Sequence, residues 1–381
     1  MQLSFQKDDA LQAIAPLQGV IGSKSMLPIL SHVVLEAENE EGRVMGSDLE
    51  LWISASFPAK VKEKGAATIP GRHFMSIIRE LPGQDAELST GEDNITRIKC
   101  QKAYFQVMGL AREDFPAQPE LKDAENVTIK QRDLKLILHR TAYACAQDPS
   151  RQQLNGVCML FEPGKLTAVS TDGRRLAMAL AEAEVPAGIK KEIILPLKAV
   201  LELQRILGDD GDVLLKVGSR QIGFQLPRVL FIARLLEGRY PNWQQVIPAN
   251  TKEKISLPRE EFIQVVRRMS LLTSEKSNSI KLAFKPGGVT VSSGAPEVGE
   301  SREEMPLDYQ GGEIELTFNP LFITDVLKAL EDEQVFLELV DGNSPGLFRI
   351  DGQFLCVILP MKMTCWRTGR RQETPRSSAT S

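Results

Sequence analysis

The chain of 381 residues has 42% hydrophobic and 25% charged side chains, which is typical of a globular protein long enough for two or three domains. No apolar run approaches the roughly 20 residues that span a bilayer, and the N-terminus lacks the apolar segment of a secretory signal. We therefore expect a cytoplasmic protein. The net charge of −4, from 46 basic and 50 acidic residues, argues against a protein coated in positive charge for nucleic acid.

Cysteine and histidine are too few and too scattered for a cluster of metal ligands. The five cysteines show no CxxC spacing, and the three histidines are far apart in the sequence. We therefore expect reduced, mostly buried thiols, no metal and no cofactor. So few histidines also argue against a hydrolase built on a Ser-His-Asp or metal-water centre.

The predicted elements, in chain order, are a helix at 9–18, a hairpin at 32–48 and a second helix at 73–81. The same three elements return at 132–145, 157–173 and 198–207, and again at 260–269, 280–294 and 321–330. The second helices end on Leu81, Leu207 and Leu330, which are 126 and 123 residues apart. Their spacing predicts one buried apolar face per helix, and on the first of them it consists of Phe74, Ile77 and Leu81.

Three copies of a unit of about 120 residues therefore account for the chain up to residue 363. The predicted fold class is α+β, with two helices packed on antiparallel sheets in each copy. The predicted domains are residues 1–122, 123–249 and 250–363, separated at proline-rich segments. Residues 364–381 hold four arginines and one glutamate and are predicted to be a disordered basic tail, so the remaining chain carries −7.

Basic side chains recur at equivalent positions of these helices. Arg79, Arg205 and Lys328 each stand two residues before the closing leucine. Arg72 and Lys198 also correspond, but the third copy has a leucine there. A surface that faces phosphates and an ordinary solvated helix face are both consistent with this pattern.

Six separated segments carry a resemblance to a known family: LPILSHVVLEA (27–37), SDLEL (47–51), LNGVCM (154–159), STDGRRLAM (170–178), LEGRYPNWQQVIP (236–248) and LPMKM (359–363). Together they closely resemble the bacterial DNA polymerase III beta subunit, the sliding clamp, over residues 1–363. The resemblance implies a non-catalytic processivity factor. It implies a head-to-tail homodimer that forms a ring around double-stranded DNA, without sequence preference, and no membrane partner. It also implies that the ring tethers the replicative polymerase, the clamp loader and other proteins with a clamp-binding motif.

Three sets of site residues follow from the resemblance. The groove for partner peptides, between the second and third domains, is predicted to consist of Leu154, Thr171, Gly173, Arg174, Arg175, Leu176, Pro241, Val246, Val357, Leu359 and Met361. The DNA channel, which also draws on the recurring basic positions, is predicted to contain Lys24, Arg72, Arg79, Arg132, Lys135, Arg151, Lys198, Arg205 and Lys328. The dimer interface is predicted to contain Lys102, Phe105, Val107, Leu271, Leu272, Glu297, Glu300 and Glu303.

One residue departs from the family pattern, and one segment also fits a different function. Gln245 stands where many family members have arginine, so a charged contact to acidic peptides is absent. The STDGRR segment also fits an enzyme, with Asp172 as acid or nucleophile and two arginines that clamp phosphate. A turn at Asp-Gly is the favoured interpretation, because no GxxxxGK[ST] or GxGxxG motif occurs. An adaptor that keeps the fold without encircling DNA ranks second, and a phosphotransfer enzyme third.

Overall fold

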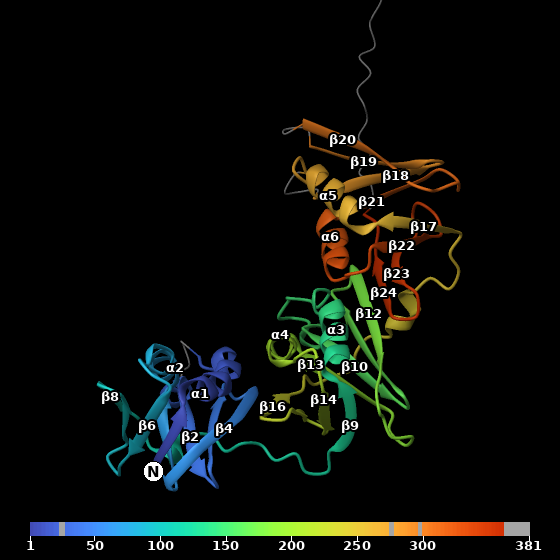
Figure 1. Cartoon of the computed structure of the whole chain (residues 1–381). Coiled ribbons are helices and arrows are strands. Elements are labelled where there is room, and N and C mark those ends of the chain that lie inside the picture. The colour runs from blue at the N-terminus through green and yellow to red at the C-terminus, as the bar shows by residue number, and fades with distance from the viewer. Residues whose placement is uncertain (23–26, 274–277, 296–298, 362–381) are drawn as a thin grey trace, which may run out of the picture. The chain divides into compact units, whose positions relative to one another are not determined.

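The computed structural model describes residues 1–22, 27–273, 278–295 and 299–361. Within them the chain runs three times through one order of elements: a strand, a helix, four strands, a second helix and three strands (Figure 1). The predicted fold class, a threefold repeat of two helices with antiparallel sheets, is therefore confirmed.

The three copies correspond element by element. The first copy contains β1 (Gln2–Gln6), α1 (Lys7–Ile14), β2 (His32–Glu38), β3 (Glu41–Ser47), β4 (Leu51–Glu63), β5 (Gly65–Pro70), α2 (Gly71–Glu80), β6 (Asp85–Thr90), β7 (Ile95–Cys100) and β8 (Ala103–Met108). The second contains β9 (Glu125–Lys130), α3 (Gln131–Ala142), β10 (Gly156–Glu162), β11 (Lys165–Thr171), β12 (Arg175–Glu182), β13 (Lys191–Pro196), α4 (Leu197–Ile206), β14 (Asp212–Val217), β15 (Gln221–Gln225) and β16 (Val229–Arg234). The third contains β17 (Glu253–Pro258), α5 (Arg259–Ser270), β18 (Ile280–Lys285), β19 (Gly288–Ala295), β20 (Gly299–Pro306), β21 (Ile314–Phe318), α6 (Pro320–Lys328), β22 (Gln334–Leu339), β23 (Gly346–Ile350) and β24 (Phe354–Ile358).

The predicted helix faces are mostly correct. In α4 and α6 the predicted apolar positions are fully buried, as are Leu134 and Leu138 in α3. In α2 the prediction was wrong at one position, because Ile78 is buried and Ile77 is only half-buried. Phe74 and Ile78 are four residues apart and lie on one side of the helix, which turns Ile77 toward the edge of that face.

Short signals in the sequence set the ends of these elements. Strands β5, β13 and β17 each end in proline, which cannot donate a further ladder hydrogen bond, and a helix begins at the next residue. Helix α6 begins after Asn319, whose side chain accepts a hydrogen bond of 2.9 Å from the Leu321 amide. The predicted hairpins turn at equivalent places, with Gly164 and Gly287 in the left-handed region in the second and third copies.

The chain forms two compact units, which are described separately. The first comprises Met1–Ile247 with Ile350–Cys356, and the second comprises Pro248–Arg349 with the chain from Val357 onward. In the first unit one sheet runs in the order β8-β7-β6-β1-β4-β16-β15-β14-β9 and so passes from the first copy into the second. Its crossing point is the antiparallel pair β4–β16, from Val229 opposite Ala55 to Ala233 opposite Leu51. A backbone ladder therefore joins the two copies.

The second unit contains most of the third copy. Its four-stranded sheet has the order β20-β19-β18-β21, so β20 is an edge strand, and β22 pairs with both β17 and β23. Helices α5 and α6 pack against each other, as Figure 1 also shows. The predicted domain boundaries stay predictions. Lys24, Glu297 and the tail at 364–381 lie outside the described residues. None of the helices in the described part of the chain is long and apolar enough to cross a membrane.

Candidate functional site

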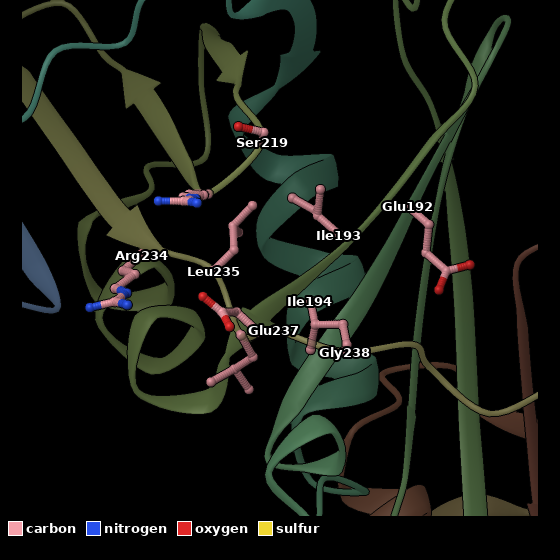
Figure 2. Close-up of a pocket in the computed structure, with 10 residues that line it drawn as sticks. Glu192, Ile193, Ile194, Ser219, Arg234, Leu235, Glu237 and Gly238 are labelled. Carbon is pink, nitrogen blue, oxygen red and sulfur yellow. The ribbon is translucent and has the colours of Figure 1, made fainter.

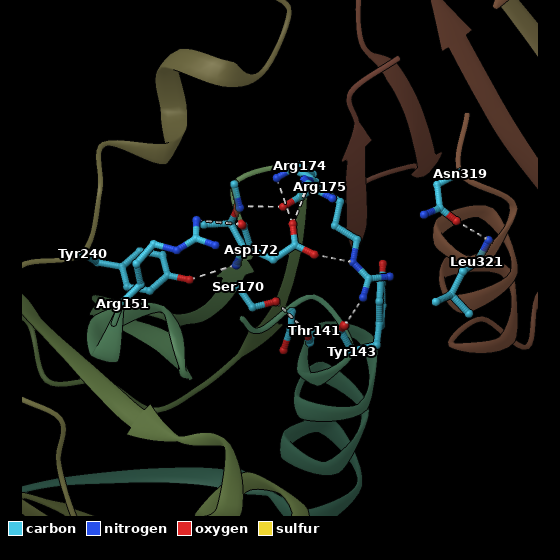
Figure 3. Close-up of polar contacts among 12 residues, drawn as sticks. Thr141, Tyr143, Arg151, Ser170, Asp172, Arg174, Arg175, Tyr240, Asn319 and Leu321 are labelled. Atoms are coloured by element: carbon cyan, nitrogen blue, oxygen red, sulfur yellow. Dashed lines mark hydrogen bonds and ion pairs between the residues drawn. The ribbon is translucent and has the colours of Figure 1, made fainter. Parts of the chain in front are cut away.

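The turn of residues 171–175, between β11 and β12, is organised by Asp172 (Figure 3). Its carboxylate accepts hydrogen bonds from the backbone amides of Arg174 (2.8 Å) and Arg175 (3.0 Å). Gly173 has a φ of +87°, a conformation that side-chain-bearing residues rarely adopt, and its amide donates to Thr171 Oγ1 at 3.0 Å. The interpretation of this segment as a turn is therefore confirmed, and Asp172 acts as its cap.

Buried polar contacts fix this turn to the domain beneath it. Arg175, whose side chain is 9% exposed, pairs with Asp172 at 3.1 Å and donates to the Tyr143 carbonyl at 2.6 Å. The Thr171 amide donates to the Tyr240 hydroxyl at 3.0 Å, and the Ser170 hydroxyl donates to the Thr141 carbonyl. These contacts hold the main chain and side chains of the turn against the domain at several points, so the base of the turn is rigid.

The ionisable groups under the turn are not suited to acid–base or nucleophilic chemistry at neutral pH. Burial raises the pKa of the Cys145 thiol to about 12, so the thiol stays protonated. Burial likewise raises the pKa of the Tyr240 hydroxyl well above its ordinary value. Neither group is therefore charged at neutral pH.

The residues predicted for the partner groove divide between the two units. In the first unit Leu154 and Leu176 are buried beneath the surface, while Gly173, Arg174, Pro241 and Val246 are exposed. The buried leucines therefore support the surface from below. In the second unit Val357 is buried, and Leu359 and Met361 are exposed.

Arg151, predicted for the DNA channel, contacts the 171–175 turn. Its Nη1 donates to the Asp172 carbonyl at 3.1 Å, and its Nε donates to the Asp148 carboxylate at 3.4 Å. Figure 3 shows its guanidinium reaching toward the turn. A residue assigned to DNA and the turn assigned to partner peptides are thus in direct contact.

The other residues predicted for the DNA channel are helical and differ in their partners. Arg72 and Arg79 on α2, Arg132 on α3 and Lys328 on α6 are exposed and form no ion pair within the described residues. Lys135 pairs with Asp209 at 3.0 Å.

Two basic residues of α4, Lys198 and Arg205, each contact a side chain of the first copy. Lys198 pairs with Asp48 of the first copy. Arg205 contacts Glu202 at 3.2 Å and Gln18 of the first copy at 3.3 Å. An added Cβ at Gly19 would overlap the Glu202 carboxylate, so glycine is what allows this close approach. These two basic residues therefore help to hold the first two copies together.

Two of the predicted dimer residues of the first unit, Phe105 and Val107, line one open cavity, and the third, Lys102, is exposed outside it. Strand β8 is the terminal strand of its sheet, and Tyr104 and Met108 on it are exposed. The cavity of about 540 Å³ is lined by Phe105 and Val107 together with residues of α2 and the end of β5. An unpaired strand edge beside an apolar cavity is an expected place for association with another chain.

The predicted dimer residues of the second unit lie near its edge strand β20. Leu271, just beyond α5, is 78% exposed, and Leu272 is half-buried. Glu303 on β20 accepts a hydrogen bond of 2.9 Å from Arg268 on α5, and this contact lowers the pKa of the Glu303 carboxyl. Glu300 is exposed and forms no ion pair within the described residues. The Glu303 carboxylate is thus already paired with Arg268 of the same chain.

A smaller cavity of about 270 Å³ lies elsewhere in the second copy (Figure 2). Ile193, Ile194 and Leu235 supply its apolar wall, and Figure 2 shows the Arg234 guanidinium directed away from the two isoleucines. None of the residues predicted for peptide, DNA or dimer contacts lines this cavity.

Several residues around the turn were not found from the sequence. Tyr143, Asp148 and Tyr240 position it, yet only Tyr240 lies within one of the family-like segments. Tyr143 follows α3 without any local signal of this role, because its partner Arg175 lies 32 residues away. Asp148 reaches the turn through Arg151, which is three residues along the chain.

Comparisons with known proteins cover nearly the whole chain. Family models of the DNA polymerase III beta subunit match residues 1–119 (N-terminal domain), 128–242 (central domain) and 244–363 (C-terminal domain). The beta sliding clamp of Chlamydia pneumoniae is 32% identical over 95% of this chain and 99% of its own. That of Staphylococcus aureus strain Mu50 is also 32% identical, over 94% and 96%.

Solved structures agree with the sequence matches. The DNA polymerase III subunit beta of Pseudomonas aeruginosa superposes with a TM-score of 0.90 at 30% identity, over 95% of this chain and all of that chain. The DNA polymerase sliding clamp of Bacillus subtilis gives 0.91 at 28%, over 95% and 99%. Three repeated domains that all match one family define a sliding clamp, the non-catalytic subunit that makes a DNA polymerase processive. The chain belongs to the DNA polymerase III beta subunit family.

Proposed function

We propose that two copies of this chain close head to tail into a ring around double-stranded DNA in the cytoplasm. The observation that carries the proposal is that each strand has an equivalent in the other copies. The first and second copies are joined by β4 and β16, and their equivalents β20 and β8 are both sheet edges. If β20 of one subunit pairs with β8 of another as β4 pairs with β16, two identical interfaces result, and the assembly is closed.

The charges of the chain fit a ring that slides on DNA. The body is acidic, but Arg79 and Lys328 stand at equivalent helix positions, are exposed and form no ion pair with the residues that the structure describes. Contacts from such residues to phosphates carry no sequence information, so the ring would move along the duplex. Retention on DNA would then depend on encirclement more than on affinity.

We further propose that the surface around the 171–175 turn binds short peptides of the replicative polymerase, the clamp loader and other partners. The rigid turn, the exposed Val246 and the supporting Leu154 and Leu176 provide an apolar surface with a polar edge. Leu359 and Met361, also predicted for partner peptides, are exposed in the second unit. A structure of the Pseudomonas aeruginosa clamp, with a TM-score of 0.92 at 30% identity over 95% of this chain and all of that one, is bound to griselimycin, and this supports a ligand surface in the family.

Retention on circular DNA tests the encirclement. Protein loaded on a nicked circle by a clamp loader is expected to stay on it through a gel-filtration column. After one double-strand cut it is expected to run off the ends, because few phosphates are neutralised at a time. Equal retention on circular and cut DNA would show tight binding without encirclement, and would exclude the ring.

The salt dependence of DNA binding distinguishes the basic residues. Arg132→Ala is expected to lower the slope of log affinity against log salt by about 0.9, the value for one lost phosphate contact. Lys198→Ala is expected to lower it less, because Asp48 already neutralises that ammonium. Titrations of a short duplex from 50 to 200 mM salt measure both slopes. Equal slopes for the two variants would contradict the distinction.

A further inference from the structure

We propose that Arg151 couples the two activities by covering the 171–175 turn in the free protein and leaving it for a DNA phosphate. The inference rests on the proposed peptide surface and DNA channel, and assigns one residue to both. In this arrangement a clamp on DNA presents a more accessible turn than a free clamp does.

The contacts of Arg151 place its guanidinium on the exposed main chain of the turn. Besides the bond from Nη1 to the Asp172 carbonyl, the same nitrogen would lie 3.2 Å from a Cβ built on Gly173. Arg151 therefore occupies the acceptor of Asp172 and the open side of Gly173 together. A partner peptide that runs along the turn would need this space and this carbonyl.

These contacts are weak enough to exchange. The side chains of Arg151 and Asp148 are 46% and 45% exposed, so water screens their ion pair. A phosphate offers the same guanidinium charge-assisted, two-pronged hydrogen bonds in place of those it gives up. Arg175 differs, because it is nearly buried between Asp172 and Tyr143 and supports the turn from below. Of these two arginines, only Arg151 is free to move without loosening the turn.

Peptide binding at the 171–175 turn and phosphate binding by Arg151 then favour each other. When a phosphate holds Arg151, peptide binding no longer has to break its bond to Asp172, and a bound peptide in turn releases Arg151 toward DNA. Because only one exposed side chain carries the coupling, we expect a small effect, a change in peptide affinity of about three- to tenfold.

A peptide titration on free and DNA-loaded protein tests this coupling. The probe is a fluorescein-labelled peptide of the QLxLF type, titrated by anisotropy against free protein and against protein loaded on nicked circular DNA. The wild type is expected to bind it about three- to tenfold more tightly when loaded. Arg151→Ala is expected to bind as tightly without DNA as the loaded wild type does. Gln152→Ala, an exposed neighbour on the same loop, is expected to keep the wild-type difference.

The outcomes separate this inference from the function on which it rests. If Arg151→Ala weakens peptide binding to the free protein, Arg151 supports the turn, and the covering role is wrong. Equal affinity of the wild type with and without DNA would also overturn the coupling while leaving the peptide surface intact. If the wild type binds no peptide in either state, the proposed peptide surface itself fails.

Discussion

Leu271→Asp is expected to convert the proposed dimer into single chains. Leu271 is 78% exposed in the isolated chain, so the substitution leaves the folded subunit intact. In the proposed ring it would place a carboxylate in both apolar seams, at a cost of several kcal/mol each. Sedimentation equilibrium is expected to report the mass of one chain for the variant and of two chains for the wild type.

A matched variant controls for the added charge. Leu201→Asp introduces the same change at another exposed leucine, on α4 and outside the predicted interface, and is expected to leave the dimer unchanged. A Leu271→Asp protein that sediments as a dimer would show that the chain associates through another surface.

Val246→Asp is expected to weaken partner peptides by about 10- to 150-fold, or roughly 1.5–3 kcal/mol. Val246 is 46% exposed, and a charge there would face the apolar anchor of the peptide without disturbing the core. Isothermal titration with a QLxLF-type peptide measures the loss, and sedimentation checks that the ring persists.

The control for this variant lies two residues away. Gln244→Asp adds the same charge to the same short helical segment, Trp243–Val246, at a position outside the predicted surface. It is expected to change peptide affinity less than threefold, a limit set by the small effects of most interface-rim residues. Equal losses in the two variants would mean that net charge, and not contact with Val246, controls peptide binding. Leu176→Ala is a poorer test, because Leu176 is buried and its truncation leaves a cavity.

Local patterns predicted the repeated framework well. The 3.6-residue spacing found the helices, and alternating apolar residues on either side of a glycine marked the hairpins that close at Gly164 and Gly287. The exchange of Ile77 for Ile78 on the buried face of α2 could not be predicted, because both isoleucines fit an amphipathic stripe. Packing against neighbouring strands decided between them.

The sequence supplied candidate site residues but not their contacts. In the sequence, Lys198 is one of several basic residues on helices. Its partner Asp48 lies 150 residues away, and only the fold brings the two together. Arg151 likewise gave no sign of its bond to the Asp172 carbonyl. The family-like segments therefore supplied the candidate residues for functional surfaces. The structure adds which charges are already engaged within the chain.

The backbone ladder between β4 and β16 also bears on how these proteins diverge. Hydrogen bonds between main chains do not depend on which side chains the strands carry, so many substitutions leave the ladder in place. The side chains at this seam, among them Leu51, Ile53 and Phe231, are fully buried, so a substitution there must still fit the core. A joint carried by peptide groups fits solved relatives that are 28–30% identical to this chain and superpose with TM-scores near 0.9. The geometry of such a joint persists through the backbone wherever a new side chain packs as well as the one it replaces.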